Sequence, residues 1–79
     1  MNWHPHIVAT PDTCTGKPRV KGTRITVELL LNCMAAGYPE SRILEEYPQL
    51  SAEQIRAAVA FASMRVGSDS TLAGLEAAA

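Results

Sequence analysis

The chain has 79 residues and a formal net charge of −1, with 47% hydrophobic and 19% charged residues. This balance is typical of a folded globular domain and excludes an intrinsically disordered one, while the near-zero charge argues against attraction of the whole molecule to nucleic acid. A domain of this size buries only about 60% of the surface that its unfolded chain exposes, so we expect a partner subunit to stabilise it.

The N-terminal segment predicts neither export nor membrane insertion. It has no basic region followed by a long apolar run, and the most apolar stretch, VELLLNCMAA, is too short to cross a bilayer. Cys14 and Cys33 are the only cysteines, too few for a disulfide framework. We therefore expect a cytoplasmic protein with reduced thiols and no contact with a membrane.

Two short strands are expected before the first helix. The apolar run HIVATPD, which ends at Pro11, favours a brief strand. A second strand is predicted over residues 18–21, because Val20 and residues 24–27 have β character in this glycine-punctuated segment, and Gly22 predicts a turn after the strand.

Three helices follow, each with its own terminal signals. Thr26 is a suitable N-cap for a first helix from Val27 to Ala36, which Gly37 would end. A second helix is expected from Pro39, at its first helical position, to about Tyr47. The sequence SAEQ, residues 51–54, fits a capping box that opens a third helix, and this helix is expected to run from Ala52 to about Val66.

These elements predict a mainly α fold: a three-helix helix-turn-helix (homeodomain-like) bundle behind a short N-terminal β element. Residues 1–66 would form a single domain. Residues 67–79 are small and weakly apolar, so we expect a flexible C-terminal tail that orders on a partner.

The third helix carries two apolar sets on a helical wheel. One set predicts the core stripe and consists of Ile55, Ala58, Val59, Ala62 and Val66. The other lies on the far side and consists of Ala57, Phe61 and Met64. The tail could fold back over this second set, but a subunit interface is favoured because it also supplies the missing stabilising partner. Base readout is disfavoured, since only Gln54 and Arg56 there could form hydrogen bonds with base edges.

Four of the seven basic residues lie within GKPRVKGTRI, residues 16–25: Lys17, Arg19, Lys21 and Arg24. On an extended segment the first three alternate and would project from one face, where they could contact phosphates. The alternative is an edge strand whose lysines and proline block pairing with other chains. Arg24 could instead form an ion pair with Glu28, one helical turn later.

Enzyme chemistry and a metal site are not expected. His4, His6 and Cys14 could bind zinc, but the sequence offers no evident fourth ligand. Glu45 and Glu46 are adjacent and therefore do not face each other on a helix. The chain also lacks a phosphate-binding loop, a nucleophile elbow and an acid triad. We therefore expect a protein that is not an enzyme and holds no cofactor or metal.

Residues 16–62 resemble the family called domain of unknown function 433. The matching motifs are Gly-Lys-Pro, then Lys-Gly-Thr-Arg-Ile, Ala-Gly at the first helix end, an acidic helix running into Tyr-Pro, and Leu-Ser before the third helix. They stand at Gly16–Pro18, Lys21–Ile25, Ala36–Gly37, Ile43–Pro48 and Leu50–Ser51. The chain departs from the family in having Pro39 where a serine is common, and its C-terminal tail lacks the charge expected of a segment that threads into a toxin.

The resemblance implies a function in a bacterial toxin–antitoxin pair. It implies an antitoxin-type protein that neutralises a PIN-like nuclease by protein contact, with binding of double-stranded operator DNA as a second activity. The subunit interface expected on the third helix would make this protein a homodimer. Phosphate contacts would come from the four clustered cations, and base contacts from Gln54 and Arg56. Two other functions stay open: a stand-alone DNA-binding transcriptional regulator, and a protein-interaction module without a nucleic-acid role.

Overall fold

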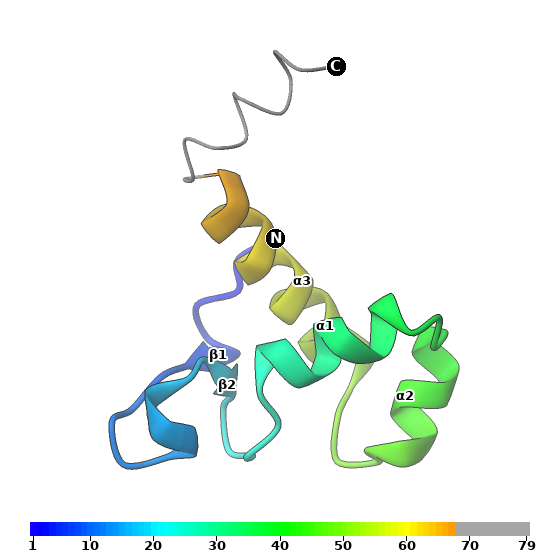
Figure 1. Cartoon of the computed structure of the whole chain (residues 1–79), viewed down its shortest axis with the longest axis horizontal. Helices are drawn as coiled ribbons and strands as arrows, with labels where there is room; N and C mark the ends of the chain where they lie inside the picture. Colours follow the sequence, from blue (N-terminus) through cyan, green and yellow to red (C-terminus); the bar gives the residue numbers. More distant parts are fainter. Residues whose placement is uncertain (68–79) are drawn as a thin grey trace.

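The computed structural model describes residues 1–67 and shows three helices behind a two-stranded antiparallel ribbon (Figure 1). The predicted mainly α fold with a short N-terminal β element is therefore confirmed. The elements are β1 (Ile7–Val8), a short 3-10 turn η1 (Cys14–Gly16), β2 (Arg19–Val20), α1 (Val27–Ala35), α2 (Glu40–Glu46) and α3 (Ala52–Gly67).

The ribbon pairs Ile7 with Val20 and Val8 with Arg19. Both strands were predicted, and both are shorter than expected. The turn η1 between them was not predicted, because Cys14 and Thr15 adopt positive φ values of 53° and 54° there, a region in which non-glycine residues are uncommon.

A hydrogen-bonded corner connects the ribbon to α1. Gly22 has a φ of 80°, as the predicted turn requires. The Thr23 hydroxyl donates to the Val20 carbonyl at 2.8 Å and accepts from the Ile25 amide at 3.0 Å. The Thr26 hydroxyl then accepts from the third amide of α1, which confirms it as the N-cap. The corner thereby fixes the direction in which α1 leaves the ribbon.

The link between α1 and α2 is a Schellman motif around Gly37, whose φ is 92°. The Gly37 amide donates to the Met34 carbonyl and the Tyr38 amide donates to the Cys33 carbonyl, both at 3.0 Å. Pro39 follows as the N-cap of α2 rather than its first helical residue, because its backbone is still extended. The predicted start of α2 was therefore one residue early.

The capping box at the start of α3 is confirmed in both directions. The Gln54 amide donates to the Ser51 hydroxyl at 3.2 Å, and the Ser51 amide donates to the Gln54 side-chain oxygen at 2.9 Å. This exchange satisfies two backbone donors that the first helical turn would otherwise leave unpaired.

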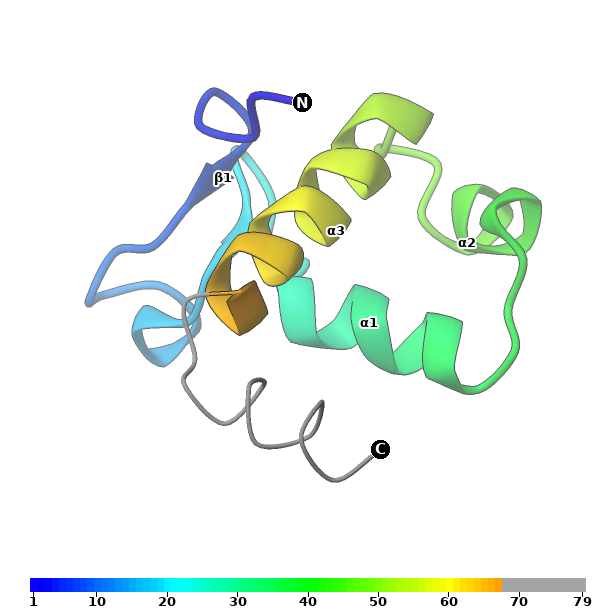
Figure 2. The same cartoon turned by 90° about the horizontal axis from the view of Figure 1, so that it is seen from above.

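The core lies where α3 passes between the ribbon on one side and α1 and α2 on the other (Figure 2). Its fully buried large side chains are Val20, Leu30 and Ile43. The full core comprises Ile7, Val20, Ile25, Val27, Leu30, Ile43, Leu50, Ile55, Ala57 and Ala58.

The predicted faces of α3 need correction. Ile55 and Ala58 are buried as expected, but Val59 and Val66 of the expected core stripe are 42% and 55% exposed. Ala57, expected on an exposed interface, is fully buried. Among residues 1–67, the helix has neighbours on two sides in its first half and few in its second, so burial falls along its length instead of following one stripe.

Of the predicted tail, residues 67–79, only Gly67 lies within the described residues, as the last residue of α3. Across residues 1–67, no helix is both long and apolar enough to span a bilayer.

Candidate protein-binding groove and basic turn

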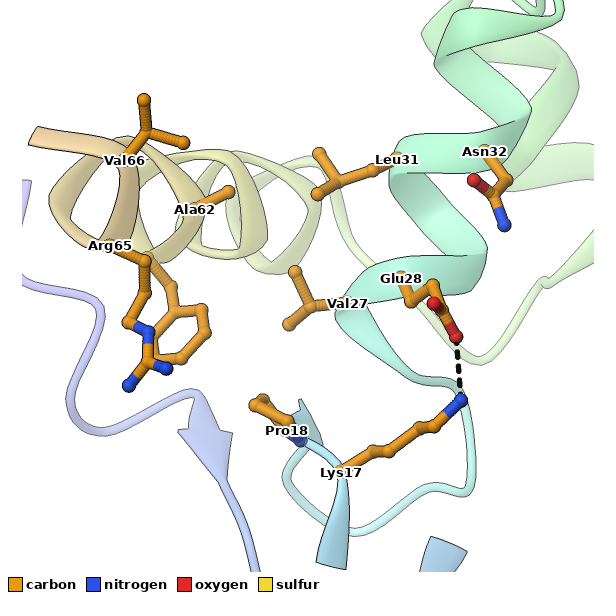
Figure 3. Close-up of a pocket in the computed structure, with 10 residues that line it drawn as sticks. Lys17, Pro18, Val27, Glu28, Leu31, Asn32, Ala62, Arg65 and Val66 are labelled. Atoms are coloured by element: carbon orange, nitrogen blue, oxygen red, sulfur yellow. Dashed lines mark hydrogen bonds and ion pairs between the residues drawn. The ribbon is translucent and has the colours of Figure 1, made fainter. Parts of the chain in front are cut away.

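A groove of about 430 Å³ opens between α1 and the second half of α3 (Figure 3). The Val27 and Leu31 side chains extend from α1 toward α3, where Ala62 lies opposite them. The apolar lining consists of Pro18, Val27, Leu31, Phe61, Ala62 and Val66, and the polar lining of Lys17, Glu28, Asn32 and Arg65. The groove is therefore mainly apolar, with charged side chains around it.

One side of the groove carries an ion pair between Lys17 and Glu28. Their Nζ and Oε1 atoms are 2.8 Å apart, and both side chains are exposed. The hydrogen bond and the charge of the lysine lower the pKa of Glu28, and the carboxylate raises the pKa of Lys17 in the same way. The pair is accordingly intact at neutral pH and is lost as the pH falls through the lowered carboxyl pKa. Glu28 thus pairs with Lys17 and not with Arg24.

The other side carries Arg65, in the last turn of α3. No ion pair or hydrogen bond of its side chain is found among residues 1–67. Because Lys17 is neutralised by Glu28, Arg65 is the positive charge beside the groove that no acidic group within residues 1–67 compensates.

Phe61 lines the groove and also packs against the N-terminal segment. Its ring meets that of Trp3 edge-on, with the centroids 4.8 Å apart. This contact was not predicted from the sequence, although a tryptophan so close to the N-terminus signals a segment that packs on the domain. Of the three residues predicted as a protein interface, Phe61 borders an open surface, Met64 is 40% exposed outside the groove lining, and Ala57 is inside the core.

The four clustered cations do not form one row. Arg19 is held inward: its Nε donates to the Thr23 carbonyl at 3.1 Å and its Nη1 to the Thr10 hydroxyl at 3.2 Å. Lys21 and Arg24 are exposed around the Gly22 turn, and within the described part of the chain no acidic side chain pairs with them. We call residues 21–24 the basic turn.

His6 connects the basic turn to the first turn of α3. The Lys21 amide donates to the His6 carbonyl at 2.8 Å, and His6 Nε2 lies 3.5 Å from Glu53 Oε1. The two predicted base-reading residues are both engaged nearby: Gln54 closes the capping box, and Arg56 Nη2 is 3.9 Å from Glu40 Oε1. Base readout by α3 would therefore have to displace existing contacts and overcome two carboxylates.

The potential zinc ligands are not brought together. His4 stacks on Trp3 with 3.9 Å between ring centroids, and its Nδ1 lies 2.8 Å from the Asn2 side-chain oxygen. Cys14 Sγ is 3.5 Å from the Arg24 carbonyl oxygen. Within residues 1–67, no three His, Cys, Asp or Glu side chains are grouped closely enough to hold a metal ion.

The fold and the surface define a small three-helix protein with a β ribbon, an apolar groove and a separate basic turn. Residues 7–62 match the model of the family described as protein of unknown function DUF433. The chain belongs to this family, as its motifs indicated.

Two relatives show how the shared unit occurs elsewhere. An uncharacterized protein, y4eO, from Sinorhizobium fredii (strain NBRC 101917 / NGR234) is 41% identical over 56 residues, which are 71% of this chain and 25% of that protein. A DUF433 member protein of known crystal structure, from Anabaena variabilis ATCC 29413, is 36% identical with a TM-score of 0.72, over 73% of this chain and 57% of that one. The chain thus spans about a quarter of the Sinorhizobium protein.

Proposed function

We propose that this chain acts by binding another protein, as the antitoxin-type partner of a PIN-like nuclease. The observation that carries the proposal is the apolar groove between α1 and α3, which residues 1–67 leave open. Grooves between helices often bind an amphipathic helix of a partner protein, which places its apolar face against the groove lining. Phe61, which was predicted to lie in a protein interface, borders this groove.

The charges around the groove specify the partner further. Arg65 is uncompensated among residues 1–67, so the partner segment should carry an acidic residue beside its apolar side chains. An exposed pair of this kind adds specificity and association rate more than affinity, and the apolar contact supplies most of the free energy of binding.

The test is co-expression of the tagged chain with the product of the neighbouring open reading frame. We expect the two proteins to co-purify at a fixed ratio and the neighbour alone to be toxic. Val66→Glu should abolish co-purification, since Val66 lines the groove and is 55% exposed, so that its replacement leaves the core intact. Ala60→Glu, in the same helix and outside the groove lining, is the matched control and should still co-purify.

The outcomes separate the role from the surface. A harmless neighbour and a chain that elutes without it would overturn the antitoxin role. Co-purification that Val66→Glu leaves unchanged would keep the role and place the contact on another surface. Circular dichroism of both variants shows that the comparison is made between folded proteins.

The basic turn supports a second candidate function, binding of double-stranded DNA through phosphates. Lys21 and Arg24 are exposed and lack acidic partners among residues 1–67. Lys21→Glu should weaken a gel shift at low salt and reduce the slope of log affinity against log salt by about 1. Arg65→Glu makes the same charge change in the last turn of α3, about 18 Å along the helix from its first turn. This variant should leave the gel shift nearly unchanged. No shift for the unmodified chain at low salt would overturn this candidate.

A further inference from the structure

A second hollow lies on the other half of the α1–α3 face. Its volume is about 280 Å³, and it is lined by Met34 from α1, Glu40 and Ile43 from α2, and Ile55, Arg56 and Val59 from α3. It shares no lining residue with the groove described above. Whatever occupies it therefore need not compete for the same side chains.

Val59 is the exposed apolar side chain at this hollow among residues 1–67. It follows Ile55 by one helical turn, and Ile55 is 2% exposed while Val59 is 42% exposed. The sequence pattern thus gives Val59 the position of a core residue, but no side chain within residues 1–67 covers it. A valine beside an unfilled apolar hollow can serve as the projecting group that fills an identical hollow on another molecule.

The two charged residues of the hollow make it electrically neutral. Glu40 begins α2 and Arg56 lies in α3, so the acid and the base come from different helices. Their Oε1 and Nη2 atoms are 3.9 Å apart, and the side chains are 40% and 69% exposed. This is a long and loosely held contact, so both groups retain hydrogen-bonding capacity for a second molecule.

We propose that this hollow is the seat of a second copy of the chain, related by a two-fold axis. In a two-fold interface, a contact from one residue to another always occurs twice with the roles exchanged. Val59 of each copy enters the other copy's hollow, Glu40 meets the partner's Arg56, and Arg56 meets the partner's Glu40. One acid and one base on the same neutral patch satisfy this symmetry without leaving a charge over.

The small size of the domain favours the same arrangement. Its core holds few large side chains, and domains of this size commonly gain stability from a partner subunit. The proposal is independent of the proposed function, because the partner protein was assigned to the other groove. The dimer relocates the predicted subunit contact from the face of Ala57, Phe61 and Met64, of which Ala57 is buried in the core, to the face of Val59.

The decisive experiment mixes two variants of opposite charge, with the mass in solution measured by sedimentation equilibrium. Glu40→Arg gives each copy two cations at the hollow, and Arg56→Glu gives each copy two carboxylates. Each variant alone should be largely monomeric at concentrations where the unmodified chain is dimeric, since like charges then face each other twice. An equimolar mixture should form heterodimers, because both contacts between unlike copies join opposite charges again.

The mixture distinguishes this interface from a merely internal role of the Glu40–Arg56 pair. Within each copy the two charges stay alike, so an internal role cannot be restored by mixing. Val59→Glu should also give monomers, whereas Ala60→Glu, about 100° around α3 from Val59 and outside the lining of the hollow, should remain dimeric. The proposal would be overturned by an unmodified chain that stays monomeric over the whole concentration range of the sedimentation experiment. A mixture of the two variants that stays monomeric where the unmodified chain is dimeric would overturn it as well.

Discussion

Replacing Ala57 by glutamate is expected to unfold the protein. Ala57 has no exposed surface in α3, where the ribbon covers one side of the helix and α1 and α2 cover the other. A carboxylate forced into such a site without a partner costs on the order of several kcal/mol. A domain of this size has a free energy of unfolding of about 5 kcal/mol. Far-UV circular dichroism should therefore show little helix at 25 °C.

Ala60→Glu is the control for this variant, because the change is chemically the same in the same helix. Ala60 is only partly buried and lies outside the core. Its thermal transition should stay close to that of the unmodified chain. If Ala57→Glu instead kept a normal transition and lost only its association with another molecule, Ala57 would lie on an interface, as the helical wheel predicted.

Leu30→Ala should produce the next largest loss. Leu30 is fully buried at the centre of the core, and removing three carbon atoms from such a site costs about 2–5 kcal/mol. In a domain this small, the midpoint of thermal unfolding should fall by more than about 10 °C. Urea denaturation followed by circular dichroism measures the free energy directly.

The neighbouring Leu29 provides the comparison, since it is only partly buried and packs at the edge of the core. Leu29→Ala makes the identical chemical change in the same turn of α1 and should cost clearly less. Equal losses for the two variants would show that the helix itself, rather than the buried position, determines the cost.

The parts of the fold that the sequence predicted well depend on neighbours along the chain. The cap at Thr26, the left-handed glycine at Gly37 and the exchange between Ser51 and Gln54 each involve residues within a few positions of one another. Their chemistry is complete within one turn, so reading the chain locally is sufficient. The start and end of α1 and the start of α3 follow from these signals.

The parts that could not be predicted depend on contacts between distant segments. Lys17 reaches Glu28 across eleven residues, a spacing that no helical rule covers. The helical wheel assumes one buried stripe, but α3 is covered on two sides, which buries Ala57 and leaves Val59 open. The candidate site also depends on a contact between distant segments. Phe61 was identified as an interface residue, but the groove beside it is formed together with α1, which the wheel of a single helix does not include.

The contact between Trp3 and Phe61 also gives the groove a natural optical signal. Trp3 is the only tryptophan of the chain, and its ring lies 4.8 Å from that of Phe61, which lines the groove. Any molecule that settles against Phe61 changes the surroundings of this one indole. The intrinsic fluorescence of the unlabelled protein therefore serves as a direct monitor of groove occupancy, with every other fluorophore in the chain a weaker emitter.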